Sequence, residues 1–188
     1  MRSNKKGFSL IEMMVVVGII GVLTTIAVPN FMRFTAKAKQ THAKTELSTI
    51  YGTEKAFFTE FGVYHPNLIF IGYTPDGAKL DANGCPQAGA SNWPVRYYAV
   101  GFPATGVAAT VPGVTTVPCS TGSGATYATV FPRLDTAGAL KIDIPSASAM
   151  TPATDFVIGA AGKISSKAAN DEWTMDSDKV LTNTVVGY

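Results

Sequence analysis

Residues 5–31, KKGFSLIEMMVVVGIIGVLTTIAVPNF, decide the organisation of this 188-residue chain. From Phe8 to Val28 the segment has 21 residues, and Glu12 is its only charged residue. As a helix it would be about 30 Å long, which matches the hydrocarbon core of a bilayer. We therefore expect a membrane-spanning helix. A carboxylate near the bilayer centre costs about 2.5–3.5 kcal/mol, so the presence of Glu12 needs an explanation.

The composition of the whole chain favours one compact domain and excludes wholesale disorder, because 46% of its residues are hydrophobic. The formal net charge is +2, from 15 Lys and Arg against 13 Asp and Glu, and three of the basic residues lie in the first seven positions. A nucleic-acid-binding protein is expected to show a much larger basic excess. The charge therefore predicts no nucleic-acid partner.

The N-terminal segment has two further interpretations besides a simple membrane anchor. A secretory signal would be cut near Ala27, but the apolar stretch is longer than a typical signal core and the helical pattern continues past Pro29. The other interpretation places a cut after Gly7. This cut would leave a free amine on Phe8, one helical turn before Glu12.

A cut after Gly7 would explain why Glu12 is tolerated. The amine of Phe8 is a cation near neutral pH, so Phe8 of a second copy of the chain can neutralise Glu12. At about 4 Å and an effective dielectric constant near 20, their attraction is about 4 kcal/mol before the cost of desolvation. The segment is then predicted to be an assembly device as well as an anchor.

The run Lys6-Gly7-Phe8-Ser9-Leu10-Ile11-Glu12 closely resembles the prepilin signature of type IV pilins and of the related pseudopilins. The resemblance implies cleavage between Gly7 and Phe8 by a prepilin peptidase, N-methylation of Phe8, and pairing of Glu12 with Phe8 of an adjacent subunit. Gly21 and Pro29 fit the same pattern. In pilin filaments the helix between such a glycine and proline loosens, and the alternative for Pro29 is an ordinary kink at the membrane boundary.

The resemblance also implies how the chain is divided and where it goes. Residues 1–7 would be the leader, 8–29 the transmembrane and assembly helix, and 30–188 the globular domain. The precursor would sit in the inner membrane with a single span. The pilus assembly machinery would then extract it into an extracellular helical homopolymer that serves twitching motility, adhesion or DNA uptake.

Residues 30–61 continue as an amphipathic helix. Its apolar stripe has one polar member, and Gly62 ends it. The stripe consists of Leu47, Ile50, Tyr51, Glu54, Phe57, Phe58 and Phe61. Such a stripe is usually the surface on which a sheet packs.

The C-terminal half predicts an antiparallel sheet over about 93–182. Strands are expected at 95–102, 126–131 and 155–160, with a final hairpin from 172–175 and 180–182. Residues 103–124 and 143–154 are rich in Gly, Pro, Ser, Thr and Ala, and are expected to be surface loops. A long helix followed by an antiparallel sheet is an α+β arrangement, which is the pilin fold.

The two cysteines, Cys85 and Cys119, flank the first expected strand. Because an exported protein meets an oxidising compartment, we expect a disulfide rather than two buried thiols. It would close a loop of 33 residues and stabilise the fold by about 4 kcal/mol. Many pilins place their disulfide nearer the C-terminus, so this position departs from the family pattern.

The sequence shows no arrangement of residues that is typical of a catalytic site. Neither histidine, His42 or His65, stands in a metal-ligand spacing or beside a nucleophile, so we expect no enzyme, cofactor or metal site. Calcium binding, known in related pseudopilins, is an alternative for the C-terminal acidic residues, for which a solvated hairpin is the favoured interpretation. These residues are Asp171, Glu172, Asp176 and Asp178.

Two rival functions share parts of this pattern. A type II secretion pseudopilin or a minor pilin would have the same N-terminus. The long Thr/Gly/Ala-rich loops and the end sequence NDEWTMDSDKVLTN favour a pilin. A membrane-tethered enzyme or binding domain would work as a monomer and would not need Glu12.

Overall fold

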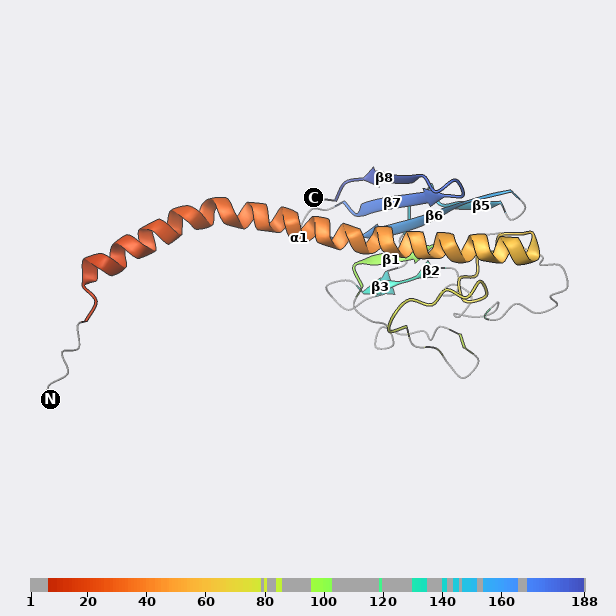
Figure 1. Cartoon of the computed structure of the whole chain (residues 1–188), viewed down its shortest axis with the longest axis horizontal. Coiled ribbons are helices and arrows are strands. Elements are labelled where there is room, and N and C mark those ends of the chain that lie inside the picture. The colour runs from red at the N-terminus through yellow and green to blue at the C-terminus, as the bar shows by residue number, and fades with distance from the viewer. Residues whose placement is uncertain are drawn as a thin grey trace. The chain divides into compact units, whose positions relative to one another are not determined.

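The computed structural model describes residues 7–78, 80, 84–85, 96–102, 119, 130–134, 140–141, 144–145, 147–151, 154–165 and 169–187. These residues form one α-helix and eight β-strands (Figure 1). Helix α1, Leu10–Phe61, has 52 residues and continues through Pro29. The chain forms two compact units, Met1–Ala38 and Lys39–Tyr188.

The C-terminal end of α1 is set by Gly62. Its φ of 72° lies in the left-handed region, which residues with a Cβ rarely adopt. Its N–H donates to the carbonyl of Phe58 at 2.8 Å, which satisfies one of the carbonyls that a helix end leaves free. The chain then turns back toward the sheet.

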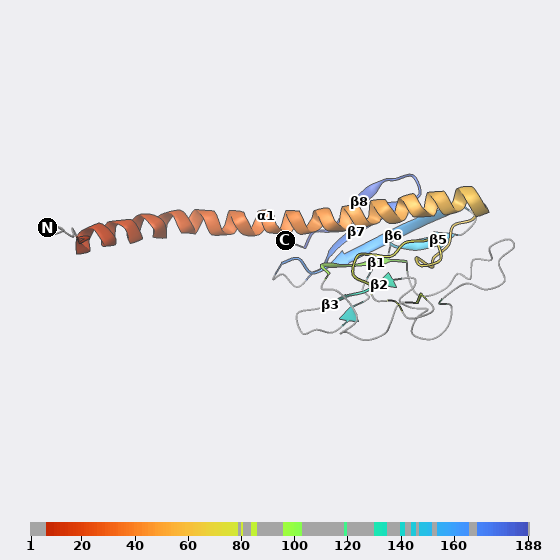
Figure 2. The same ribbon diagram turned by 60° about the horizontal axis from the view of Figure 1, so that its bottom comes forward.

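Within the second unit, residues 39–61 of α1 lie along one face of the sheet (Figure 2). Leu47 and Ile50 are completely buried there, and the ring of Tyr51 lies 6.1 Å from that of Phe156 on the sheet. Burial of each aliphatic side chain contributes roughly 1.5–3 kcal/mol. The predicted apolar stripe is therefore the core-facing side of the helix.

The main sheet has the order β2-β1-β6-β7-β8, with β5 as a further partner of β6, and every pairing is antiparallel. Its strands are β1 (Tyr98–Gly101), β2 (Val130–Phe131), β5 (Ala149–Thr151), β6 (Asp155–Gly162), β7 (Asp171–Asp176) and β8 (Leu181–Val185). A separate two-stranded sheet joins β3 (Arg133–Leu134) to β4 (Leu140–Lys141). The fold is therefore the expected α+β arrangement of a long helix on an antiparallel sheet.

The strand predictions differ from the structure in three places. The first strand begins at Tyr98 rather than at residue 95, and residues 103–118, 120–124 and 126–129 lie outside the described residues. The expectation of a loop over 143–154 was wrong, because β5 lies within it and pairs with the start of β6. Strands β3 and β4 were not expected. Segments of two or three residues do not show the alternation that identifies a strand.

Close backbone approach explains two glycines of the central strand β6. A Cβ on Gly159 would lie 1.9 Å from the Oγ of Ser148, and one on Gly162 would lie 2.2 Å from the carbonyl oxygen of Tyr97. Both distances are far below van der Waals contact. The absence of these side chains lets the neighbouring segments pack directly on β6.

Candidate functional site

The N-terminal unit exposes the apolar side chains that a globular unit would bury. Every large apolar side chain from Phe8 to Phe34 is exposed. The helix contains an 18-residue window of mean hydropathy 2.4 with none of its residues buried, so it is long and apolar enough to cross a bilayer. A helix that is apolar on all sides is stable only where lipid or other protein covers it.

Glu12 lies in the first turn of α1 and forms a capping box with Ser9. The N–H of Glu12 donates to Ser9 Oγ at 3.3 Å, and the N–H of Ser9 donates to Glu12 Oε2 at 3.4 Å. This reciprocal pair satisfies two N–H groups at the helix start. The sequence signal for this role, Ser-x-x-Glu directly before an apolar run, was present but was not used in the prediction.

The capping box leaves most of the acceptor capacity of Glu12 unused. Both hydrogen bonds are long, and only one carboxylate oxygen takes part. Within the described part of the chain, no Lys, Arg or His forms an ion pair with Glu12. The carboxylate is therefore open to a cation from outside the chain.

The predicted cleavage site lies just before the helix. Gly7 and Phe8 are both exposed, and residues 1–6 lie outside the described residues. A Cβ on Gly7 would meet no atom within 4 Å. The fold of the chain itself therefore gives no steric reason for a glycine here.

The predicted loosening sites, Gly21 and Pro29, lie inside an unbroken helix. Pro29 has no N–H, so the carbonyl of Thr25 loses its usual helical donor. The hydroxyl of Thr25 donates to the carbonyl of Val22 at 2.7 Å, so the hydroxyl group has a hydrogen-bond partner inside the apolar segment. Loosening of the helix in a filament stays a prediction.

Comparison with known proteins identifies the family. A family model described as the prokaryotic N-terminal methylation motif matches residues 2–28. The type IV major pilin protein PilA of Myxococcus xanthus is 32% identical over 192 aligned residues, which cover 92% of this chain and 80% of that protein. This chain belongs to the type IV pilins.

Other pilins match shorter parts of the chain. The type IV major fimbrial protein FimA of Dichelobacter nodosus is 44% identical over 88 residues, or 47% of this chain and 53% of that protein. The type IV major pilin protein PilE1 of Neisseria gonorrhoeae is 42% identical over 65 residues, or 35% of this chain and 37% of that protein. Type IV pilins are structural subunits of pili, so this protein is not an enzyme.

The pilin's two cysteines, Cys85 and Cys119, form the expected disulfide, with their Cα atoms 5.4 Å apart. The bridge closes the loop that carries β1, the strand beside the central strand β6. In the chain-entropy account, a loop of this length stabilises the fold by about 4 kcal/mol. The disulfide therefore secures one flank of the sheet.

Two titratable side chains of the pilin are buried at the end of α1. The backbone N–H of His65 donates to Glu54 Oε2 at 3.3 Å, while Oε1 has no partner within the described residues. Burial raises the pKa of Glu54 to about 8. Burial also lowers the pKa of His65 to about 4. His65 Nδ1 accepts the N–H of Asn67 at 3.1 Å, which requires this nitrogen to be unprotonated.

Asp171 is completely buried and accepts hydrogen bonds from several elements of the globular unit. The interpretation of this region as a solvated acidic hairpin is therefore wrong for Asp171. The donors are Gln40 Nε2 at 2.9 Å, the hydroxyl of Tyr98 at 2.6 Å, Trp173 Nε1 at 2.6 Å, Asn183 Nδ2 at 3.3 Å and the N–H of Gly187 at 3.1 Å. The backbone N–H groups of Asp178 and Val180 donate to Asp176, which shapes the turn before β8. Among the described residues, no three His, Cys, Asp or Glu side chains gather as a metal site.

Proposed function

We propose that this pilin is the major repeating subunit of a type IV pilus and that its N-terminal segment drives assembly. The observation that carries the proposal is the exposed apolar surface from Phe8 to Phe34, with Glu12 near its start. Lipid covers this surface in the inner-membrane precursor, and the helices of neighbouring copies cover it in the filament. Both environments remove the same apolar area from water.

The first step of the proposal is processing of the precursor. A prepilin peptidase cuts between Gly7 and Phe8, and Phe8 is then N-methylated. The match of residues 2–28 to the methylation motif supports this step. The cut keeps Ser9 and Glu12 in the mature chain, so the capping box remains intact while a cationic amine is created nearby.

The second step is charge pairing between copies. The carboxylate of Glu12 in one subunit forms an ion pair with the ammonium group of Phe8 in its neighbour. The attraction between the two charges is about 4 kcal/mol at 4 Å, before the cost of desolvation. A subunit that is out of register leaves a carboxylate unpaired in an apolar environment, which is costly. The pairing therefore fixes the axial register as well as adding affinity.

The proposed partners are other copies of this pilin, the prepilin peptidase and the pilus assembly machinery. The filament then lies outside the cell, where it serves twitching motility, adhesion or DNA uptake. A type II secretion pseudopilin is the second candidate, because its N-terminus has the same form. The match over 92% of the chain to a protein named as a major pilin favours the pilus.

The experiment that tests processing and export together is N-terminal mass spectrometry of protein sheared from cell surfaces. We expect a mature chain that begins at methylated Phe8. A chain that begins after Ala27, or an uncut chain, would contradict the proposal.

A pair of variants at position 7 tests the cleavage site itself. Gly7→Ala adds one methyl group and should largely spare cleavage, whereas Gly7→Leu should block it. Because a Cβ at this position meets no described atom within 4 Å, we expect any block to arise at the peptidase. Normal processing of Gly7→Leu on a gel would rule out this site.

A further inference from the structure

The globular unit begins at Lys39, and one end of its sheet lies beside that residue. At this end Tyr98 of β1 pairs with Gly162 of β6. The residues just outside this pair are Tyr97, which is 45% exposed, and Lys163, which is also exposed. We call Lys39, Tyr97 and Lys163 the basic end of the globular unit.

Direct contacts hold the ring of Tyr97 and the ammonium group of Lys39 in place. Lys39 Nζ lies 4.8 Å from the centre of the Tyr97 ring and donates to the carbonyl of Ile164 at 3.4 Å. The ring of His42 meets that of Tyr97 edge-on, with their centres 6.4 Å apart. An ammonium group has three donors, so Lys39 can still bind a further acceptor.

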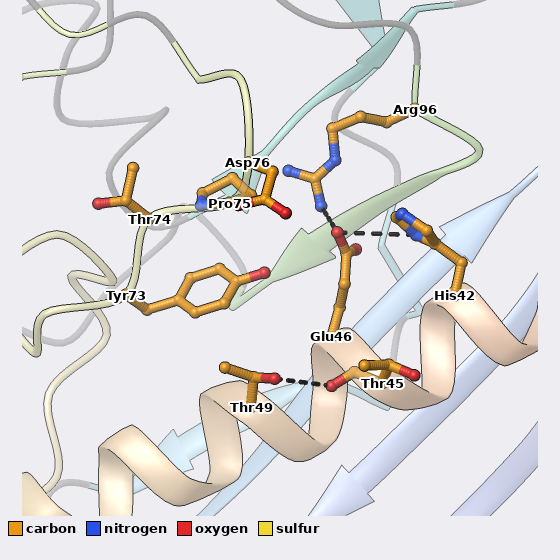
Figure 3. Close-up of a pocket in the computed structure, with 9 residues that line it drawn as sticks. All are labelled: His42, Thr45, Glu46, Thr49, Tyr73, Thr74, Pro75, Asp76 and Arg96. Atoms are coloured by element: carbon orange, nitrogen blue, oxygen red, sulfur yellow. Dashed lines mark hydrogen bonds and ion pairs between the residues drawn. The ribbon is translucent and has the colours of Figure 1, made fainter.

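The segment before Tyr97 is fixed to α1 by an ion pair. Arg96 Nη2 donates to Glu46 Oε1, and the two side chains are 4% and 13% exposed (Figure 3). This buried pair holds the backbone next to Tyr97 against the helix. The basic end is therefore a preformed surface rather than a set of independent side chains.

The positive charges of the basic end have no counter-charge within the described residues. No described Asp or Glu forms an ion pair with Lys39 or Lys163. Asp171 begins β7 at the same end, but it is completely buried and accepts five hydrogen bonds. The basic end therefore presents positive charge to its surroundings.

The chain reaches the basic end directly from the apolar segment. No acidic residue occurs between Glu12 and Glu46, whereas four Lys and Arg residues do. Arg33 is the first of the four, and Lys39 follows six residues later, about 9 Å along a helix. The headgroup layer on each side of a bilayer is about 5–8 Å thick. With Arg33 at the edge of the hydrocarbon core, Lys39 lies at the outer edge of the headgroups.

We propose that the basic end docks on anionic phospholipid headgroups while the pilin is stored in the membrane. The ammonium groups of Lys39 and Lys163 bind phosphate oxygens, and the ring of Tyr97 lies at the level of the headgroups, where such amphipathic rings are enriched. The inference rests on membrane insertion of the apolar segment, which is part of the proposed function. Docking holds the stored globular unit in one orientation, and extraction of the subunit breaks the contact.

Carboxylates of a neighbouring subunit would offer the same charge as the headgroups. The short distance along the helix from the apolar segment to Lys39 favours the lipid, and so does the exposed ring of Tyr97. The two partners differ in when they are present. A lipid surface is met by a single subunit in a membrane, whereas a neighbour is met only after assembly.

The test is the rate of lysine acetylation in the processed pilin, held in lipid nanodiscs with one copy in each disc. One set of discs contains phosphatidylcholine alone, and the other contains phosphatidylcholine mixed with phosphatidylglycerol. The reagent is the uncharged N-hydroxysuccinimide ester of acetic acid, and mass spectrometry measures the rate at each lysine. Lys179 is the internal control, because it is exposed in the turn between β7 and β8, at the opposite end of β7 from Asp171.

We expect Lys163 to react about fivefold more slowly in the anionic discs than in the neutral discs, and the rate of Lys179 to be the same in both. At about 1 M salt, where the Debye length is about 3 Å, the difference at Lys163 should disappear. Equal rates at Lys163 in the two kinds of disc would overturn the proposal.

Matched variants separate docking from a general effect of the charged membrane surface. Lys163→Gln and Lys179→Gln each remove one exposed positive charge. Lys163→Gln should restore most of the rate of Lys39 in anionic discs, and Lys179→Gln should not. If Lys39 stayed equally slow in Lys163→Gln, the two lysines would not dock together and the proposal would be wrong. Near-ultraviolet circular dichroism checks that both variants are folded.

Two further outcomes separate this proposal from the proposed function. Size-exclusion chromatography shows directly whether the pilin enters the discs, and failure to enter them would contradict both. Insertion without slower acetylation of Lys163 would overturn docking alone. Slower acetylation in sheared filaments but not in discs would assign the basic end to a neighbouring subunit and would also overturn docking on lipid.

Discussion

The two parts of α1 each carry a carboxylate on an apolar surface, and they satisfy it differently. Glu54 lies on the part that packs on the sheet. Its burial raises its pKa to about 8, so the group keeps its proton at neutral pH. Glu12 is exposed on an apolar segment and is held by a capping box. We propose that a second copy of the chain supplies its counter-charge. A carboxyl group that burial keeps protonated needs no counter-charge from another chain, whereas a charged one that depends on a neighbour requires a polymer.

The largest expected effect is the loss of filaments when the charge of Glu12 is removed. Glu12→Gln keeps a side chain that can complete the capping box, and Glu12→Ala does not. If the charge pairs between subunits, both variants should lose surface filaments by about a hundredfold, which corresponds to about 2.7 kcal/mol. Electron microscopy and the amount of pilin released by shearing measure the loss.

The control for Glu12 is Glu60→Gln, which removes an exposed carboxylate from the other end of the same helix. It should assemble normally. If Glu12→Gln also assembled normally while Glu12→Ala did not, the filament would need the cap and not the charge. The proposed pairing would then be wrong.

A second pair of variants compares one leucine from each part of α1. Leu47 is completely buried, so Leu47→Ala should lower the free energy of unfolding of the globular unit by about 2–5 kcal/mol. Leu23 is 60% exposed, so Leu23→Ala should change it by less than about 0.5 kcal/mol. Denaturant unfolding, followed by near-ultraviolet circular dichroism, measures both.

Filament assembly should respond to Leu23→Ala, although the stability of the globular unit should not. Leu23→Ala removes apolar area that neighbouring helices cover, so it should reduce the amount of sheared filament even though the globular unit stays stable. A large loss of stability in Leu23→Ala would contradict the division of α1 into an assembly part and a folding part.

The pH dependence of stability should reveal Glu54. Between about pH 4.5 and pH 8 the folded state holds a proton on Glu54 that the unfolded state has lost, so stability falls as the pH rises. Between about pH 4 and pH 6.5 the unfolded state protonates His65 and the folded state does not, so stability rises with pH. Each slope is about 1.4 kcal/mol per pH unit.

The two slopes cancel between about pH 4.5 and 6.5 in the wild type, and stability then falls up to about pH 8. Glu54→Gln should abolish that fall, about 2 kcal/mol in size, and should reveal the rise due to His65 below pH 6.5. Denaturant midpoints measured at several pH values test this, with Glu60→Gln as the control. A Glu54→Gln profile that follows the wild type would contradict the buried, protonated carboxyl.

The smallest expected effect concerns the cap itself. Ser9→Ala removes the Oγ that accepts the N–H of Glu12 but keeps the charge, so it should cost about 1 kcal/mol and loosen the first turn of α1. Amide hydrogen exchange in micelles should be faster at residues 10–13. Filaments should still form. Loss of filaments in Ser9→Ala would assign part of the role of Glu12 to the cap.

The features that depend on local patterns were predictable from the sequence. The apolar stripe around Leu47 and Ile50 repeats with the helical period, and Gly62 marks its end. The strands expected at 155–160, 172–175 and 180–182 combine β-branched and aromatic residues with turn residues between them, and the structure places them at 155–162, 171–176 and 181–185. Strand β5 was missed because three residues next to Pro152 carry no such pattern.

The features that depend on distant segments were not predictable. Arg96 meets Glu46 across 50 positions, and nothing local to either residue indicates the pairing. Asp171 had the composition of a solvated turn, but Gln40 and Tyr98 bury it by approaching from other elements. Glu54 is buried because the chain returns over the end of α1. Such contacts arise only when the helix packs on the sheet.

The hydrogen bonds of Asp171 have a mechanical consequence for a filament under tension. A pull along α1 reaches the globular unit partly through Gln40, whose amide is bonded to the carboxylate on β7. From Asp171 the load passes to β1 through Tyr98, to β8 through Asn183 and to the segment after β8 through Gly187, in addition to β7 itself. The Gln40–Asp171 bond carries its whole share of the load, whereas the bonds beyond Asp171 divide that share, so under tension we expect the contact between helix and sheet to open at Gln40 before the bonds within the sheet.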